Sequence, residues 1–219
     1  MSADVKPRRR YDSSRRQAQA AQTRHDILAA AQAMFLERGY ARTTLANIAA
    51  RAGVVVETIY RAFGGKAGLF KAVIEAAVAG GAARAEIPAE QRHAIRAVIA
   101  ETDPRRQLEL YAATQPGIHA RTGPLLGVLA DAAGEPGLAE LRSQLEDQRL
   151  AGMERFAQAL ADRGALRPGL SAAEARDVLW TLNAHDIHDR LVVQRGWPPE
   201  RYRDWLALTL KHALLADPS

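Results

Sequence analysis

The sequence predicts an all-α protein of about nine helices, in which a small N-terminal head precedes a larger helical body. Apolar residues recur at spacings of three and four along most of the chain, which is the period of an amphipathic helix. Runs of β-branched residues that alternate with period two, the pattern of strands, are absent. At 219 residues, the chain is long enough for one or two domains with sizeable cores.

The composition narrows the class of protein. The chain has no cysteine, which excludes disulfides and thiolate metal sites and fits a reducing compartment. No apolar run approaches the ~20 residues of a membrane-spanning helix, and the basic N-terminus lacks the apolar core of a secretory signal. We therefore expect a cytoplasmic protein that has no membrane partner, no metal and no cofactor.

Positive charge is concentrated in the first third of the chain. Residues 1–71 contain 13 Lys and Arg against 5 Asp and Glu, a balance of +8, whereas residues 72–219 contain 17 against 20, a balance of −3. A basic front and an acidic rear are expected if only the front meets a polyanion such as nucleic acid. Basic N-termini are also common in soluble proteins, so the charge points to nucleic acid only together with a binding motif.

The chain divides into three expected segments. Residues 1–20 form a basic arm with almost no apolar residue, which we expect to be disordered when free. Such an arm could reach DNA phosphates or a minor groove, and it could equally be a solvated tail. Residues 21–66 form the expected helix-turn-helix domain, and residues 67–219 form a helical domain for effector binding and dimerisation.

The head contains the pattern of a helix-turn-helix. Its first helix is expected to begin at Thr23, a residue suited to capping, and to end before Gly39. Thr44 caps a second helix, and the Ala-Gly-Val turn at 52–54 separates it from a third helix over 55–62. The outer face of this third helix can enter a DNA major groove.

Proline, glycine and capping residues divide the rest of the chain into further helices. The expected starts are Lys66, Pro88, Asp103, Leu138, Ser171 and Pro199. The helix from Asp103 is expected to be interrupted or bent at Gly123-Pro124. The helix from Ser171 begins with a capping box and is expected to run to about Arg195.

A set of residues in register between positions 23 and 75 makes a specific pattern: Phe35, Gly39-Tyr40, Thr44, Ile48-Ala49, Ala52-Gly53-Val54, Thr58-Ile59-Tyr60, Phe63, Lys66 and Leu69-Phe70. In these residues the chain resembles the tetracycline-repressor (TetR) family of bacterial transcriptional regulators. It departs from the family at Val55, where a small polar residue usually caps the recognition helix and reaches a phosphate. Valine can do neither, so either the cap is supplied otherwise or the third helix starts less stably.

Two groups of residues are candidates for DNA contact. The outer face of the third helix, which starts at Val55, offers Val56, Glu57, Thr58 and Arg61. Arg61 can pair with guanine, Glu57 can accept from cytosine N4, and Val56 can touch a thymine methyl, although Glu57 can instead neutralise Arg61 one turn away. The resemblance implies phosphate contacts from Thr44, Tyr60 and Lys66, with Arg42 close enough to join them. The alternatives are a core position for Tyr60 and a solvated one for Lys66.

One head reads too few base pairs for genomic specificity, so we expect a symmetric homodimer on a palindrome-like operator in double-stranded DNA. The resemblance implies that the last two helices, about 171–195 and 199–216, form the dimer interface. Their apolar residues are Val178, Leu179, Leu182, Leu191, Trp205, Leu206 and Leu210.

The body carries polar and aromatic residues on otherwise apolar helices: Tyr111, Gln115, His119, Trp180, Asn183 and His185. The resemblance implies a cavity for an effector, and apolar walls with a few polar groups suit a small organic ligand. These residues could instead face the dimer seam or solvent. His185 and His188 share a helix face, but the sequence provides no further metal ligand, so a histidine pair at the dimer seam is favoured over a metal site.

Two functional readings remain open. The favoured one is a repressor that a small organic effector releases from its operator. The alternative is a DNA-binding regulator without such a ligand, controlled by a protein partner or by its abundance. No nucleophile–base pair, phosphate loop or metal-ligand cluster is visible, so an enzyme is not expected.

Overall fold

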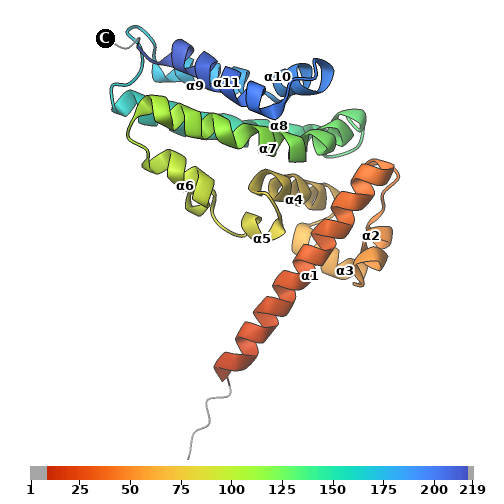
Figure 1. Ribbon diagram of the computed structural model, residues 1–219. Helices are drawn as coiled ribbons and strands as arrows, with labels where there is room; N and C mark the ends of the chain where they lie inside the picture. Colours follow the sequence, from red (N-terminus) through yellow and green to blue (C-terminus); the bar gives the residue numbers. More distant parts are fainter. Residues whose placement is uncertain (1–8, 217–219) are drawn as a thin grey trace, which may run out of the picture. The chain divides into compact units, whose positions relative to one another are not determined.

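The structure, a computed structural model, describes residues 9–216, and the regular elements within that range are helices apart from one isolated bridge between Leu166 and Leu215 (Figure 1). The prediction of an all-α fold is confirmed. The chain separates into two compact units, of which the first ends at Val73 and the second begins at Ile74. We call them the head and the body. The division lies inside helix α4 (Lys66–Ala79), beyond the boundary expected at residue 66.

The head is built from α1 (Arg9–Arg38), α2 (Leu45–Ala52), α3 (Val56–Phe63) and the first half of α4. Its centre is a group of three aromatic rings, in which Phe35 lies 4.7 Å from Phe70 and 5.6 Å from Tyr40 between ring centroids. Further fully or almost fully buried side chains complete the core: Ile27, Ala31, Met34, Ile48, Ala49, Ile59 and Leu69. Leu69 and Phe70 both belong to α4, which explains why the head extends past residue 66.

Helix α1 begins at Arg9, which corrects the expected start at Thr23. Residues 17–22 are alanine and glutamine, which favour helix wherever no competing structure exists. Thr23 lies inside the helix, and its hydroxyl donates to the Gln19 carbonyl at 2.9 Å instead of capping a helix start. The remainder of the expected arm, residues 1–8, lies outside the described residues.

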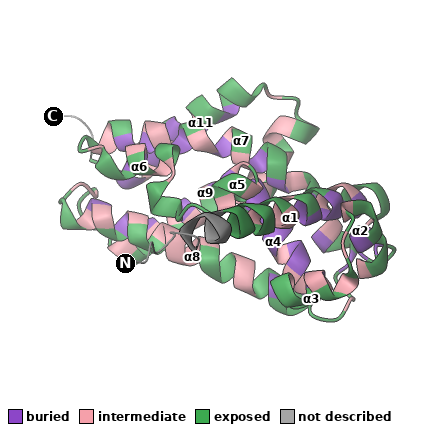
Figure 2. Cartoon of the chain, turned by 90° about the horizontal axis from the view of Figure 1, so that it is seen from below, coloured by how far each residue is buried: buried purple, intermediate pink, exposed green. Residues whose placement is uncertain are grey.

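The body is a bundle of long helices with short connecting elements. Its elements are α5 (Ala82–Ala85), the 3-10 turn η1 (Ala89–Gln91), α6 (His93–Ala100), α7 (Pro104–Asp131), α8 (Leu138–Asp162), α9 (Ala172–Leu182), α10 (His185–His188), the π-helical segment η2 (Asp189–Gln194) and α11 (Pro199–Leu214). Helices α7, α8, α9 and α11 pack against one another around a core that includes Leu108, Leu160, Leu179, Leu206 and Leu210. The burial pattern in Figure 2 shows this division into inward and outward helix faces.

Two features of the body differ from the sequence-based expectation. Helix α7 is not interrupted at Gly123-Pro124, because Leu125 and Leu129 continue the buried stripe beyond the proline. The expected helix over 171–195 is broken after Leu182, where Ala184 adopts an extended conformation before α10 begins. This break and the short turns between α4 and α6 raise the number of helices in the described range above the expected nine.

The described helices do not include one that is both long enough and apolar enough to cross a membrane.

Candidate DNA-binding surface and effector site

The turn between α2 and α3 has the geometry that its sequence predicts. Thr44 is the N-cap of α2, and its hydroxyl oxygen accepts a hydrogen bond from the Asn47 backbone N–H at 3.2 Å. Gly53 ends α2 with φ of 66°, a left-handed conformation that glycine adopts at little cost. The Val54 N–H then closes the helix end by donating to the Ala49 carbonyl at 3.0 Å. These bonds fix the path between the two helices.

The far end of α3 is held by two residues that the sequence analysis did not single out. A side chain on Gly68 would collide with the Phe63 carbonyl oxygen, so α4 can approach the end of α3 only with glycine there. Arg24 of α1 places its guanidinium 4.4 Å from the Phe63 ring centroid and 3.5 Å from the Ala62 carbonyl. A cation is favourable at this helix terminus because the last carbonyls carry partial negative charge.

The outer face of α3 presents the expected polar groups. Glu57 and Arg61 are exposed, whereas Val56 and Thr58 are half-buried. The ion pairs of the described residues do not include one between Glu57 and Arg61, so the two groups do not neutralise each other. Tyr60 is 56% exposed, which rules out the alternative of a core position for this side chain.

Val55 is the N-cap of α3 and forms no side-chain capping bond. Its side chain is 64% exposed, which is unusual for valine and leaves it at the surface where the family commonly has a polar residue. Of the two readings of this departure, the geometry therefore favours a third helix that starts without a side-chain cap.

The structure brings Lys66 to Tyr40 and Ala41, the two residues before Arg42, although Ala41 lies 25 positions earlier in the sequence. The Lys66 ammonium lies 4.1 Å from the Tyr40 ring centroid and 3.5 Å from the Ala41 carbonyl, next to the start of α2. This contact excludes the reading of Lys66 as a purely solvated lysine. Arg42 is exposed and donates from Nε to the Arg38 carbonyl at 3.0 Å.

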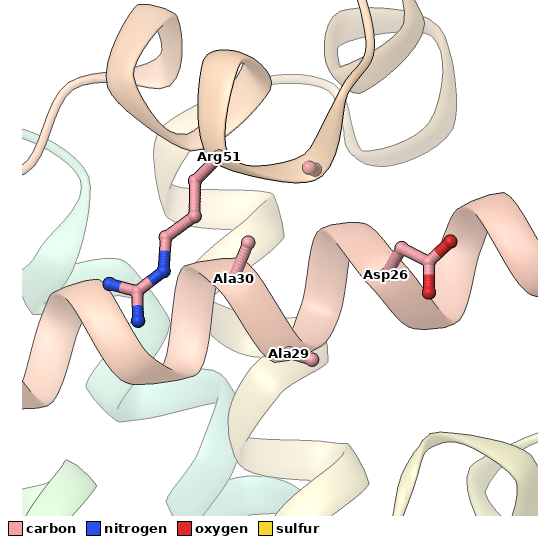
Figure 3. A pocket seen from close by; sticks show the side chains of 5 residues that line it. Asp26, Ala29, Ala30 and Arg51 are labelled. Carbon is pink, nitrogen blue, oxygen red and sulfur yellow. The ribbon is translucent and has the colours of Figure 1, made fainter.

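A shallow pocket on the head lies between α1 and α2 (Figure 3). Asp26, Ala29 and Ala30 line it from α1, and Arg51 and Ala52 line it from α2. The Arg51 guanidinium extends along α1 and binds Glu37 at 2.9 Å, and this bond lowers the pKa of the Glu37 carboxyl. None of the residues expected to bind DNA or effector lines this pocket, so we assign it no ligand.

Three imidazoles form a cluster inside the body. His119 of α7 lies 4.8 Å from His188 and 5.7 Å from His185, measured between ring centroids. Asn183, at the break after α9, accepts at Oδ1 a hydrogen bond from His119 Nε2–H at 3.1 Å. The edge of the cluster is Tyr202, whose ring stands perpendicular to that of His188 at 4.9 Å.

This cluster changes two expectations. It joins three of the expected effector residues, His119, Asn183 and His185, with His188 and Tyr202, which the sequence had not linked to them. It also corrects the favoured reading of a histidine pair at the dimer seam, because His188 is 5% exposed and packs within its own chain. Tyr202 could have been identified from the sequence by its position on the same helix as the other buried residues of α11.

The remaining expected effector residues form local contacts. The Tyr111 hydroxyl donates to Met153 Sδ at 3.3 Å, and Gln115 Nε2 donates to Thr114 Oγ1 at 2.7 Å. Trp180 lies under the Arg149 guanidinium, which is 4.6 Å from its ring centroid and donates to its carbonyl at 2.6 Å. These three residues therefore border the candidate site.

Burial disfavours the charged form of each imidazole in the histidine cluster. Desolvation lowers the pKa of His119 to about 4, although the bond to Asn183 opposes this shift. Burial also lowers the pKa values of His185 and His188. Within residues 9–216, four buried side-chain polar atoms have no hydrogen-bond partner, and all four lie in the body: Trp180 Nε1, His185 Nδ1, His188 Nδ1 and the Tyr202 hydroxyl. Such atoms are costly unless a bound molecule pairs with them.

The described residues hold no group of three or more His, Cys, Asp or Glu side chains arranged for a metal ion. The three imidazoles have roughly parallel rings, with interplanar angles between 22° and 33°. Nearly stacked rings do not direct three lone pairs at one point, as a zinc site requires.

The residues expected at the dimer interface fall into two groups. Leu179, Leu206 and Leu210 are fully buried in the core of a single chain, which corrects their assignment to an interface. Val178, Leu182, Leu191 and Trp205 are half-buried at the edge of that core, and Leu208 on α11 is 52% exposed. Only this second group offers apolar surface to another subunit.

The geometry defines a helix-turn-helix protein with a helical body. Residues 27–73 match the sequence profile of "Bacterial regulatory proteins, tetR family". The HTH-type transcriptional repressor BepR of Brucella suis is 47% identical over 60 residues, which are 27% of this chain and 29% of BepR. The HTH-type regulator TtgR of Pseudomonas putida is 47% identical over 57 residues, 26% of this chain and 27% of TtgR. The matched segment thus spans less than a third of each relative.

Solved structures resemble the chain over nearly its whole length. NalD of Pseudomonas aeruginosa, the secondary repressor of the MexAB-OprM multidrug efflux pump, aligns with a TM-score of 0.70 at 24% identity over 92% of this chain and 100% of NalD. SmeT in its complex with triclosan aligns with a TM-score of 0.66 at 25% identity over 89% of this chain and 92% of SmeT. The similarity to the tetR family of bacterial regulatory proteins thus lies in residues 27–73, and the solved structures share the fold over most of the chain.

Proposed function

We propose that this protein is a transcriptional repressor that binds a palindrome-like operator as a homodimer and leaves it when a small organic effector enters the body. One observation carries the proposal: α3 presents Glu57, Tyr60 and Arg61 to solvent from a helix-turn-helix that lies within the segment, residues 27–73, matching the tetR family of regulatory proteins. Exposed arginine and carboxylate on such a helix can read base edges in the major groove.

The DNA interface that we propose has two parts. Val56, Glu57, Thr58 and Arg61 face the bases, while Val55 lies at the start of α3 without polar contact. Arg42, Thr44, Tyr60 and Lys66 face the phosphates. The Thr44 hydroxyl accepts from Asn47 and can still donate its hydrogen to a phosphate, at a helix N-terminus that favours anions.

Helix α1 extends this interface. Residues 1–24 contain seven Lys and Arg and two Asp, a balance of +5 that equals the net charge of the whole chain. Arg24 ties α1 to the end of α3, and Arg15 and Arg16 are exposed nine and eight positions earlier. That separation is roughly 12–14 Å along a helix, comparable with the ~12 Å width of the major groove. We propose that both arginines contact phosphates flanking the groove that α3 occupies.

The effector site that we propose is the histidine cluster with Asn183 and Tyr202, bordered by Tyr111, Gln115 and Trp180. Neutral imidazoles, an amide and a phenol among apolar helices suit an uncharged organic molecule with hydrogen-bonding groups. The unpaired buried atoms favour this reading over a regulator without a ligand. The triclosan complex of the structurally similar SmeT supports a small organic molecule as the class of effector.

The dimer that we propose forms through the half-buried and exposed apolar residues of α9 and α11, which are Val178, Leu182, Trp205 and Leu208. A chain of 23.8 kDa should sediment as a dimer at micromolar concentration. Sedimentation as a monomer at that concentration would remove the dimer from the proposal.

Operator selection tests the proposal directly. The purified chain is used to enrich duplexes from a random library, and its Kd for the enriched sequence is compared with its Kd for a shuffled sequence at several salt concentrations. We expect a palindrome-like motif and a preference of about 10³-fold or more. Arg61→Gln should remove most of that preference, whereas Arg176→Gln, which alters an arginine paired with Asp177 in the body, should not. Equal, salt-sensitive binding to both duplexes would contradict a sequence-specific repressor.

A further inference from the structure

Two arginines of the body converge beside Gly80, the residue that follows α4. A Cβ at Gly80 would lie 3.0 Å from Nη1 of Arg84 and 3.7 Å from Nη2 of Arg121. Both guanidiniums therefore reach within 4 Å of one point, although Arg84 belongs to α5 and Arg121 to α7. Gly80 has φ of 89°, which glycine adopts at little cost, and its missing side chain leaves the space in which the two groups meet.

Backbone hydrogen bonds hold both arginines in place. Arg121 donates from Nε to the Ala77 carbonyl at 2.7 Å, and its Nη2 lies 3.5 Å from the Val78 carbonyl. The backbone of Arg84 is held by Arg92, whose Nε donates to the Arg84 carbonyl at 3.1 Å. Nη1 of Arg121 takes part in neither of the bonds that fix its guanidinium. The arrangement therefore positions the two groups and leaves donors for a further acceptor.

Within the described range, these two charges have no carboxylate partner. The ion pairs there include neither Arg84 nor Arg121, whereas Arg106, Arg149 and Arg176 of the same body each bind an acidic side chain. Desolvation lowers the pKa of the Arg121 guanidinium, and the nearby charge of Arg84 lowers it further. Two like charges held this close repel each other unless an anion lies between them.

We propose that Arg84 and Arg121 form a binding site for a dianionic phosphate group carried by a small molecule. Two guanidiniums from separate helices neutralise two negative charges, whereas a carboxylate offers only one. The planar fork of arginine matches the oxygens of a phosphate and can donate two parallel bonds to it. Both side chains are exposed, so the rest of the molecule can remain in solvent. The site shares no residue with the histidine cluster and does not depend on the proposed repressor function.

Binding is measured on the full chain with glycerol 3-phosphate and with inorganic phosphate as probes, at about pH 8, where phosphate groups are mainly dianionic. Isothermal titration calorimetry gives the Kd and the stoichiometry. The fluorescence of the three tryptophans, all in the body, follows its thermal unfolding. We expect one anion per chain and a midpoint that rises by roughly 3–6 °C at ten times the Kd. Sodium chloride at equal ionic strength is the control for charge screening.

Variants assign the anion to the two arginines. Arg84→Gln should weaken binding by about tenfold or more, because it removes a charged hydrogen-bond donor and leaves the Arg121 bonds to α4 intact. Arg203→Gln, which alters an arginine paired with Asp204, should leave the Kd within about twofold. Arg84→Lys and Arg121→Lys keep the charge without the fork and should give intermediate losses. Arg84→Glu places a carboxylate beside Arg121, so it should raise the midpoint without phosphate and abolish the response to phosphate.

Several results would overturn the inference. One is a midpoint shift in phosphate that is no larger than in chloride at equal ionic strength, which would show screening alone. Another is an unchanged Kd for Arg84→Gln, which would place the anion elsewhere on the chain. Acetate bound as tightly as phosphate would contradict a site for a dianion. Binding of inorganic phosphate without glycerol 3-phosphate would contradict a ligand that carries its phosphate as an ester. None of these measurements uses DNA, so they are independent of the test of the proposed function.

Discussion

The head and the body place their polar groups in opposite ways. In the head, the buried Thr43 hydroxyl has partners, since it donates to the Gly39 carbonyl at 2.8 Å, and the groups proposed to bind DNA lie on the surface. In the body, the residues proposed to bind a ligand are buried or half-buried, and four of their polar atoms have no hydrogen-bond partner among the described residues. The head can therefore contact DNA as a rigid unit, whereas the body contains buried polar atoms that lack hydrogen-bond partners. The difference shows that one chain can combine a site whose hydrogen bonds are complete after folding with a site whose hydrogen bonds are completed only when a ligand binds.

The largest expected effect is a loss of stability of the head that leaves the stability of the body unchanged. Gly68→Ala should destabilise the head by roughly 3 kcal/mol or more, because the added methyl group meets the Phe63 backbone carbonyl, which cannot rotate away. Hydrogen exchange of the α3 amides should accelerate, and operator binding should be lost. The three tryptophans, Trp180, Trp197 and Trp205, all lie in the body, so their fluorescence should show that it unfolds as before. Accelerated unfolding in that signal would contradict the separation of the two units.

The next effect is confined to the body and depends on pH. Because burial lowers the pKa of folded His119 to about 4 from 6.5, the unfolded state binds more protons between those values. The stability from the neutral ring is complete above pH 6.5 and is lost as the pH falls towards 4, with an upper bound of roughly 3 kcal/mol. Urea unfolding followed by tryptophan fluorescence at pH 7 and pH 4.5 measures this loss.

Two variants isolate the contribution of the buried ring. His119→Gln keeps a side chain that can pair with Asn183 but cannot gain a proton in this range, so its loss between pH 7 and 4.5 should be smaller than that of the wild-type chain. His93→Gln, which changes an exposed histidine of the body, should behave like wild type. An identical acid dependence for His119→Gln and wild type would argue against a neutral His119.

A smaller effect tests the uncapped start of α3. Val55→Ser supplies the missing capping hydroxyl and should stabilise the head by about 1 kcal/mol. The same hydroxyl can reach a phosphate, so operator affinity should rise rather than fall. Val193→Ser, which replaces an exposed valine of the body, is the control and should change neither quantity. A lower operator affinity for Val55→Ser would mean that the valine itself contributes to the DNA contact.

The smallest effect concerns α1. Arg15→Gln/Arg16→Gln should weaken binding to selected and shuffled duplexes by similar factors and reduce the slope of log affinity against log salt by about 1 for each phosphate contact. Arg176→Gln/Arg203→Gln removes the same charge from the body, where both arginines pair with a neighbouring aspartate. An equal change of slope in the two double variants would show that net charge, and not the position of α1, is responsible.

Local patterns predicted most of the head and the helical class of the whole chain. The Thr44 cap, the Gly53 turn and the stripe around Ile48 and Ile59 are decided by neighbours within a few residues, so the sequence contained what was needed. The start of α1 was predicted wrongly because a charged segment was read as disordered, although its alanine and glutamine residues favour helix. Of the body, sequence patterns supplied the helix starts and six candidate site residues, without showing which of them meet.

The sequence by itself determined that the chain is all-α, that its first part is a basic helix-turn-helix similar to the tetR family, and where most helices begin, because helix periodicity, caps and charge act over short distances. Only the tertiary structure decided that Gly68 lies under the end of α3, that His119 meets His185 and His188, and that Arg121 holds the end of α4. These contacts join residues 44 to 69 positions apart or depend on the approach of two backbones. No period or spacing along the chain encodes them, because they follow from how the finished helices pack.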